Sequence, residues 1–147
     1  MQTFLPYPSF IKSAAILDDK RLGKQRVEAL QIVNTILYGS RWRNHPAVKM
    51  WHGAPRTLCL YGWIICKEWK ARGFKDTLQK EFRKFIDTLD DDIGPSWLGN
   101  TDFHLSHRSN LIRKNPDFYA VRFFFEPDNL PYVWPENENV SKSFANT

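Results

Sequence analysis

Cysteine is scarce in this chain, and the two that it has, Cys59 and Cys66, form no paired motif of the kind that binds zinc. They lie seven residues apart in an apolar segment with helical periodicity, which separates them by about 10 Å along the helix. That separation is too large for a disulfide bond. We interpret both as reduced thiols of the core, which is typical of a cytoplasmic protein.

Long apolar runs and the common catalytic motifs are also missing. The longest apolar run, 58–66, is too short to span a membrane and leads into charged residues. The sequence shows no signal peptide, glycine-rich phosphate loop or Ser–His–Asp order. Of the four histidines, His104 and His107 share a predicted helix face, but no third ligand follows at a metal-binding spacing. We therefore expect neither a membrane segment nor a metal or other cofactor.

Aromatic residues and basic charge are plentiful instead. The 147 residues include six Trp, eleven Phe and five Tyr, and not all of these rings are needed in a core. Residues 1–122 hold 20 Lys and Arg against 12 Asp and Glu, whereas 123–147 hold one against four. A basic body favours a polyanionic partner, and exposed aromatic rings can stack on nucleic-acid bases.

Apolar periodicity predicts helices, and no alternating run is strong enough to predict a sheet. The four main helices extend over about 13–38 (from 13 or 18), 55–72, 76–89 and 101–114. A helical turn before residue 51 and a short helix at 116–123 complete the set.

The predicted fold class is therefore mainly α, a compact single-domain helical bundle. Pro6 and Pro8 predict an extended start. We assign 1–125 to the bundle and 126–147 to an extended acidic C-terminal tail, solvated and with a disordered last dozen residues.

The first predicted helix carries one acid, Glu28, among the cations Arg21, Lys24 and Arg26. At helical spacing Arg21, Lys24, Gln25 and Glu28 share one face. One interpretation is a solvated face with a Lys24–Glu28 ion pair; the other is a surface that binds a polyanion and performs acid–base chemistry on it. Without a second carboxylate, a glycosidase pair is not favoured. A single acid suffices if the nucleophile is an α-amine, because α-amino groups are partly neutral at physiological pH.

Two further clusters combine cations with aromatic rings. The first lies within 41–51 and the second within 107–119. Cations bind phosphates, and aromatic faces stack on displaced bases; alternatively, the rings belong to the core and the cations only confer solubility. The residues that we predict to contact DNA are Arg21, Lys24, Arg26, Arg41, Arg43, His45, His107, Arg108 and Arg113.

Three segments, in order, resemble the pyrimidine-dimer DNA glycosylases of the endonuclease V type. The first is 22–28, Leu-Gly-Lys-Gln-Arg-Val-Glu, which is similar to the helix that bears the catalytic glutamate of that family. The second lies within 60–77 and includes Glu-Trp-Lys-Ala-Arg-Gly-Phe-Lys-Asp-Thr. The third, 107–119, ends in Pro-Asp-Phe-Tyr. The resemblance extends over most of 1–123 and implies a small all-helical repair enzyme.

The resemblance also implies a mechanism without a metal. In that family the N-terminal α-amine attacks C1′ of a damaged nucleotide, and the resulting Schiff base allows strand cleavage by β-elimination. Glu28 takes the role of the glutamate, which stabilises the developing sugar cation and helps proton transfer. The nucleophile is the α-amine of Met1, or of Gln2 if Met1 is removed; the bulk of Gln2 favours retention of Met1. The expected partner is double-stranded DNA with a damaged or modified base, bound by a monomer.

Three alternatives stay open. A glycosylase of the same fold could act on another altered or hypermodified base. A non-catalytic DNA-binding module would bind DNA in a salt-dependent manner without a covalent adduct. An RNA-directed protein would stack Trp42 and Trp51 on unpaired bases.

Overall fold

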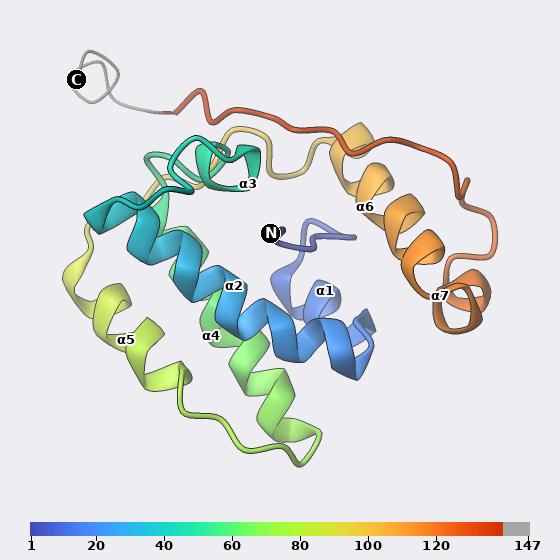
Figure 1. Cartoon of the computed structure of the whole chain (residues 1–147), viewed down its shortest axis with the longest axis horizontal. Coiled ribbons are helices and arrows are strands. Elements are labelled where there is room, and N and C mark those ends of the chain that lie inside the picture. The colour runs from blue at the N-terminus through green and yellow to red at the C-terminus, as the bar shows by residue number, and fades with distance from the viewer. Residues whose placement is uncertain (140–147) are drawn as a thin grey trace.

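The structure, a computed structural model, describes residues 1–139 and contains seven helices and no strand within that range (Figure 1). The helices are α1 (Phe10–Ile16), α2 (Asp19–Tyr38), α3 (Pro46–Lys49), α4 (Pro55–Ala71), α5 (Gln79–Thr88), α6 (Thr101–Lys114) and α7 (Pro116–Arg122). The mainly α prediction is confirmed. No helix in the described range is both long and apolar enough to cross a membrane.

The helix boundaries follow local sequence signals, with two differences from the prediction. The chain breaks at Leu17 and Asp18, so α2 has the predicted alternative start at 18, and α1 is a separate helix that was not predicted. The backbone N–H of Asp18 donates to the Tyr119 hydroxyl at 2.8 Å, so the break holds α7 against the start of α2. Helix α5 begins at Gln79 rather than Asp76, because the Asp76 carboxylate accepts a hydrogen bond from the Gln79 backbone at 2.8 Å and so lies before the helix.

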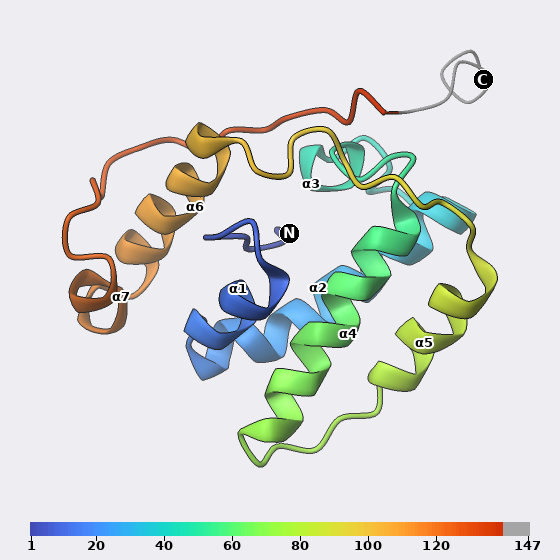
Figure 2. The same ribbon diagram turned by 180° about the vertical axis from the view of Figure 1, so that it is seen from behind.

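Helices α2 and α4 cross at the centre of the molecule, with α5 against the other side of α4 (Figures 1 and 2). Gly62 lets α4 and α5 approach closely, since a Cβ at this position would lie 2.4 Å from the ring of Phe82. Cys59 and Cys66 are buried free thiols on α4, and burial raises the pKa of each to about 12. The interpretation of both as core thiols is confirmed.

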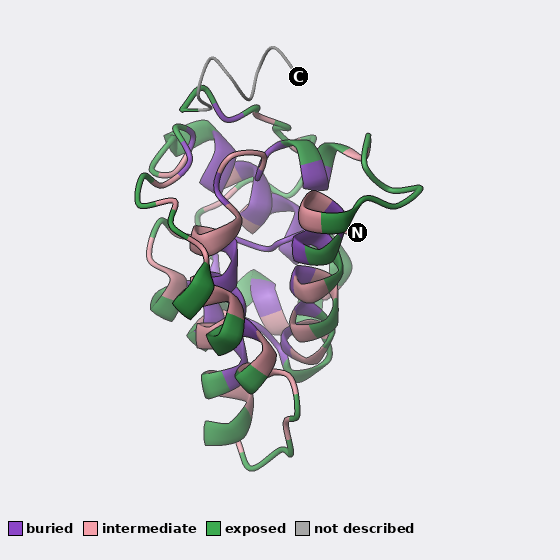
Figure 3. Ribbon diagram, turned by 90° about the vertical axis from the view of Figure 1, so that its left-hand side faces the viewer, coloured by how far each residue is buried: buried purple, intermediate pink, exposed green. Residues whose placement is uncertain are grey.

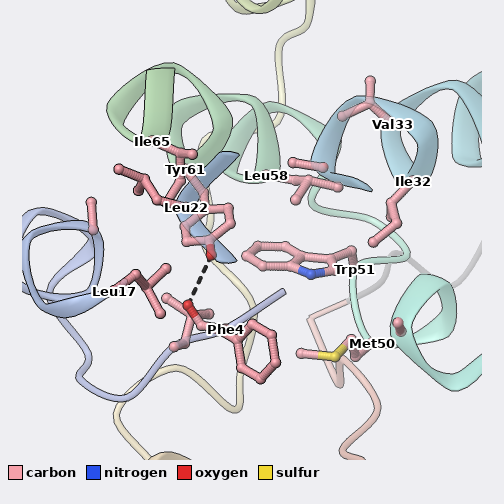
Figure 4. Packing of buried hydrophobic residues seen from close by; sticks show 14 of the residues in the cluster. Phe4, Leu17, Leu22, Ile32, Val33, Met50, Trp51, Leu58, Tyr61 and Ile65 are labelled. Atoms are coloured by element: carbon pink, nitrogen blue, oxygen red, sulfur yellow. Dashed lines mark hydrogen bonds between the residues drawn. The ribbon is translucent and has the colours of Figure 1, made fainter. Parts of the chain in front are cut away.

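The core is rich in aromatic side chains. Trp51 packs between Tyr61 of α4 and Trp97, with ring centroids 6.4 Å and 4.9 Å away (Figure 4). Phe103 of α6 continues the cluster at 4.7 Å from Trp97. Buried residues gather between the helices, and exposed residues lie on their outer faces (Figure 3). The alternative that the Trp residues belong to the core therefore holds for Trp51, which is fully buried.

Residues 2–6 form an extended segment that runs through this core and has no strand partner. Side chains of helices bind its backbone groups. Gln25 accepts from Phe4 N at 2.9 Å, and Tyr61 lies 2.8 Å from Phe4 O (Figure 4). His107 accepts from Leu5 N at 2.9 Å. Because these partners come from α2, α4 and α6, the N-terminus is fixed relative to the whole bundle.

The described part of the segment assigned to the C-terminal tail, 126–139, has an extended backbone. It packs along α6, where Ser109 accepts from Leu130 N at 3.0 Å and Ser106 from Val133 N at 3.2 Å. Further on, Asn137 is 8 % exposed and accepts from Ser96 N at 3.0 Å. Helix side chains thus satisfy the polar backbone that solvent was expected to satisfy. Most of the predicted disordered stretch, 140–147, lies outside the described residues.

Candidate active site

The side chain of Gln25 connects the residues at the bottom of the candidate site, which we call its floor. This side chain is 1 % exposed and uses both ends of its amide. Its Oε1 accepts from Phe4 N, and the hydroxyl of Tyr61 lies 2.7 Å from the same oxygen. Its Nε2 lies 2.9 Å from Gln2 O and 3.2 Å from Glu28 Oε2. One buried side chain therefore joins the N-terminal segment to the Glu28 carboxylate.

The N-terminus lies next to Glu28. The backbone N–H of Gln2 donates to Glu28 Oε2 at 3.4 Å. Consecutive backbone nitrogens are separated by three covalent bonds, at most about 3.7 Å, so the Met1 amine lies within about 7 Å of this carboxylate. The predicted catalytic residues Met1, Gln2 and Glu28 are thus brought together in space.

A pocket of about 270 Å³ opens over this floor. Basic side chains of α2 and α6 form one side, and the C-terminal segment adds two aromatic rings. The residues that line it are Met1, Gln2, Phe4, Lys20, Arg21, Lys24, Gln25, Glu28, Lys114, Tyr132 and Trp134. A pocket that combines a carboxylate beside a chain terminus with cations and aromatic rings can bind an anionic backbone and perform acid–base chemistry on a group held in it.

The match with known proteins falls on the part of the chain that builds this floor. The family model for pyrimidine dimer DNA glycosylases matches residues 1–82, more than half of the chain. The chain belongs to this family. Membership implies a DNA glycosylase whose substrate is DNA with damaged bases. No curated protein and no solved structure matches the chain.

His45 of this glycosylase lies at the edge of the pocket. Its Nδ1 accepts from Ala47 N at 3.0 Å and so caps α3. Desolvation, together with the positive charge of the N-terminal amine, lowers the pKa of His45, whereas Glu28 opposes the shift. A neutral His45 has one ring N–H left as a donor. Its ring also lies 6.1 Å from Trp134, edge to face.

Two of the predicted DNA contacts, Arg41 and Arg43, lie in the exposed turn before α3. The guanidinium of Arg41 lies over Trp42, 4.9 Å from the ring centroid. Arg41 and Trp42 line a second, open pocket with Gln31 of α2. Ring contacts connect this turn to the active-site pocket. Trp42 lies 6.2 Å from His45, and the ring of His45 lies 6.1 Å from Trp134, which lines the pocket. These cations therefore extend the basic surface beyond the pocket.

Other predicted contacts are already engaged within the fold. Arg26 binds Asp76 at 2.6 Å and lies over Trp69. Arg21 pairs with Asp18 at 3.1 Å but still lines the pocket.

On α6, the guanidinium of Arg108 donates to Pro6 O at 2.8 Å and pairs with Glu126 at 3.4 Å. Arg113 donates to the backbone oxygens of Asp128 and Leu130 at 2.7 and 2.6 Å. Both arginines hold extended segments against the bundle. Lys24 has no ion pair among residues 1–139, so the structure lacks the Lys24–Glu28 pair of the alternative interpretation.

His107 lies in the core rather than on the DNA-facing surface that we predicted for it. It is fully buried, and burial lowers its pKa to about 3. Its Nδ1 accepts from Leu5 N, so the neutral ring holds the N-terminal segment in place. His104 has a related role: it accepts from Gly99 N at Nε2 (2.9 Å) and donates to Leu5 O from Nδ1 (2.8 Å). Residues 1–139 contain no group of three or more His, Cys, Asp or Glu that could hold a metal ion.

The aromatic wall of the pocket, formed by Tyr132 and Trp134, was not predicted from the sequence. Tyr132 and Trp134 lie in the segment assigned to the tail, but their rings are 5.4 Å apart and both line the pocket. Tyr132 also packs 5.6 Å from His107. The available signal was the Tyr-Val-Trp alternation, which places both rings on one side of an extended chain. Lys20 and Lys114 add two cations that were not assigned to the site.

Proposed function

We propose that this protein excises a damaged pyrimidine, a pyrimidine dimer in the first instance, through an N-terminal-amine Schiff base assisted by Glu28, and then cleaves the strand as an AP lyase without a metal. The observation that carries the proposal is the placement of the chain terminus beside Glu28 at the floor of a basic pocket. An amine within about 7 Å of a carboxylate suits covalent catalysis at a sugar carbon bound between them.

The steps balance without a co-reactant. The amine nitrogen forms a bond to C1′ as the C1′–N1 bond breaks, and the electron pair leaves with the base, which takes a proton from water. Glu28 accepts a proton from the new C1′–N⁺ group and returns it to O4′ as the sugar ring opens, which leaves a protonated Schiff base. Loss of a proton from C2′ then breaks the C3′–O bond, and the 3′ phosphate departs. Hydrolysis of the Schiff base restores the amine.

The pocket also supports the proposed partner, double-stranded DNA bound by a monomer wherever the cell keeps its DNA. Lys20, Lys24 and Lys114 line one side of the pocket and can bind phosphates on either side of the target nucleotide. A target base must leave the stack to reach Glu28, and Trp134 and Tyr132 offer ring faces to an extruded base. Arg41 and Arg43 extend the phosphate contacts along the duplex.

We assign the nucleophile to the amine of Met1. Gln2 is too bulky a second residue for efficient methionine removal. A free N-terminal glutamine would also cyclise, because its amine attacks its own side-chain amide and expels ammonia, and the resulting lactam is not nucleophilic. Intact-mass measurement tests this assignment: the active protein retains Met1, and active protein that lacks Met1 would contradict it.

Borohydride trapping tests the whole proposal, on a duplex with a cyclobutane thymine dimer and on a matched abasic duplex. We expect a covalent adduct on both, mapped to the N-terminal peptide. Glu28→Gln should abolish base release but leave duplex binding within the range of the control Glu81→Gln, which changes an exposed glutamate on α5. Trapping on the abasic duplex alone would indicate another modified base. Tight binding without any adduct would support the non-catalytic module and refute the proposal.

A further inference from the structure

The side chain of Gln2 has one polar atom without a partner. Gln2 is 6 % exposed and lines the pocket. Its backbone N–H donates to Glu28, and its backbone oxygen accepts from Gln25. Its side-chain Oε1 accepts from Thr3 N at 2.9 Å. The side-chain Nε2 is buried and has no hydrogen-bond partner within the described chain.

The orientation of this amide is fixed by chemistry. Thr3 N is a donor only, so the oxygen of the Gln2 amide must face it and the NH₂ group must be the free end. A buried donor without a partner lowers the stability of a protein, and native structures rarely keep one without a reason. The cations of the pocket, Lys20, Lys24 and Lys114, are also donors and cannot satisfy it. Because Gln2 lines the pocket, a small shift of its side chain would bring this NH₂ group to an acceptor that enters the pocket.

We propose that Gln2 Nε2 donates a hydrogen bond to the carbonyl oxygen O2 of the departing pyrimidine and so stabilises the leaving group. This inference rests on the proposed function. In that reaction C1′ lies near the amine and Glu28, and Gln2 follows Met1 directly in the chain. The O2 atom is bonded to the ring carbon next to N1, so it lies close to the glycosidic bond that breaks.

A donor at this position acts on the transition state more than on the bound substrate. As the C1′–N1 bond breaks, its electron pair moves onto N1 and is shared with O2. The hydrogen bond from Gln2 therefore strengthens as the reaction proceeds, which lowers the barrier rather than tightening substrate binding. Gln2 gives up no proton in this step, and the departing base still takes its proton from water.

Two substitutions test the inference, and both keep a bulky second residue so that Met1 is retained, as intact mass would verify. Gln2→Glu keeps the acceptor for Thr3 N and replaces the donor with an oxygen. Gln2→Met keeps the length of the side chain without polar atoms. Two rates are compared. The first is single-turnover base release from the dimer duplex, which means cleavage of one C1′–N1 bond, scored as alkali-labile strand breaks because the freed base stays bonded to its neighbour in the dimer. The second is borohydride trapping on the abasic duplex, where no such bond is left to break.

We expect the ratio of base release to abasic-site trapping to fall about a hundredfold in both variants, the usual effect of removing one transition-state donor. If base release and trapping fall together in both variants, the side chain only shapes the N-terminus and the inference is wrong. An unchanged ratio with both rates retained would also refute it. A wild-type protein that traps neither substrate would refute the proposed function itself, which is a separate outcome.

Discussion

Two extended segments cross this helical molecule, and they are held in different ways. Residues 2–6 are buried, and side chains of three helices bind their backbone groups. Residues 128–133 lie along the outside of α6, where Ser106, Ser109 and Arg113 bind them. Both segments contribute to one pocket: the first supplies its floor and the second its aromatic wall.

The difference separates a fixed part of the site from an adaptable one. An amine that attacks a single carbon must be held within a fraction of an ångström, and the buried segment provides that precision. In the proposed mechanism the wall has to admit an extruded base, and a segment held at the surface can shift at lower cost than a buried one. We therefore expect changes at the floor to affect both stability and chemistry, and changes at the wall to affect mainly the chemistry.

The largest effect is expected from Gln25→Leu, which breaks the floor. Phe4 N and Gln2 O lose their partner, and Tyr61 loses one of two acceptors. Buried unpaired groups of this kind should lower the free energy of unfolding by roughly 3 kcal/mol, and base release should be lost as the N-terminus moves. Chemical denaturation and single-turnover kinetics measure the two effects.

The matched control is Gln31→Leu, which changes an exposed glutamine two turns further along α2. Its stability should stay close to that of the wild type. Equal losses in the two variants would show that Gln25 has no special role at the floor.

The second prediction concerns the pH dependence of the free energy of unfolding, and it tests how His107 holds the buried segment 2–6. The pKa of His107 is about 3 in the folded protein, against about 6.5 for an unfolded histidine. Between these values the unfolded state binds a proton that the folded state does not, so the free energy of unfolding decreases as the pH falls below about 6.5. From pH 7.5 to 5.0 the loss through His107 is about 2 kcal/mol.

Denaturation at the two pH values checks this prediction against the variant His107→Asn. The asparagine carbonyl can still accept from Leu5 N, but it does not titrate. The variant should lose the His107 part of the pH dependence, although its stability at pH 7.5 is lower. The same pH dependence in both proteins would place the proton on another group, such as His104, whose pKa desolvation also lowers.

These contrasts also explain how far the sequence could be interpreted. Helices α2, α4 and α6 were predictable from local signals: the spacing of apolar residues, Pro55 at a helix start and Gly39 at a helix end. The helix face with Glu28 was predictable for the same reason. The role of His107 was not, because a histidine next to Arg108 on a helix resembles a surface residue, and only tertiary packing buries it. The wall was missed because a proline-spaced acidic segment has the composition of a solvated tail.

The third prediction concerns the aromatic wall, which should come loose when Arg113 is changed. Arg113→Gln removes the donors that hold the backbone oxygens of Asp128 and Leu130. The free energy of unfolding should fall by only about 1 kcal/mol, because the segment lies at the surface. Base release should fall more than stability suggests, as Tyr132 and Trp134 leave the pocket. Tyrosine and tryptophan fluorescence quenching would report the release of the segment, and unchanged quenching would contradict it.

The smallest effect is expected from a change at Lys24. This residue lines the pocket and has no ion pair within the described residues. Its ammonium is available to a phosphate, whereas the guanidinium of Arg113 is occupied by backbone oxygens. Lys24→Gln should weaken duplex binding a few-fold and reduce the slope of log affinity against log salt by about 0.9, the contribution of one phosphate contact. Arg113→Gln and Lys80→Gln, on α5, should leave that slope unchanged. If Arg113→Gln reduces the slope as much as Lys24→Gln, Arg113 contacts DNA directly, and the segment that it holds must move when DNA binds.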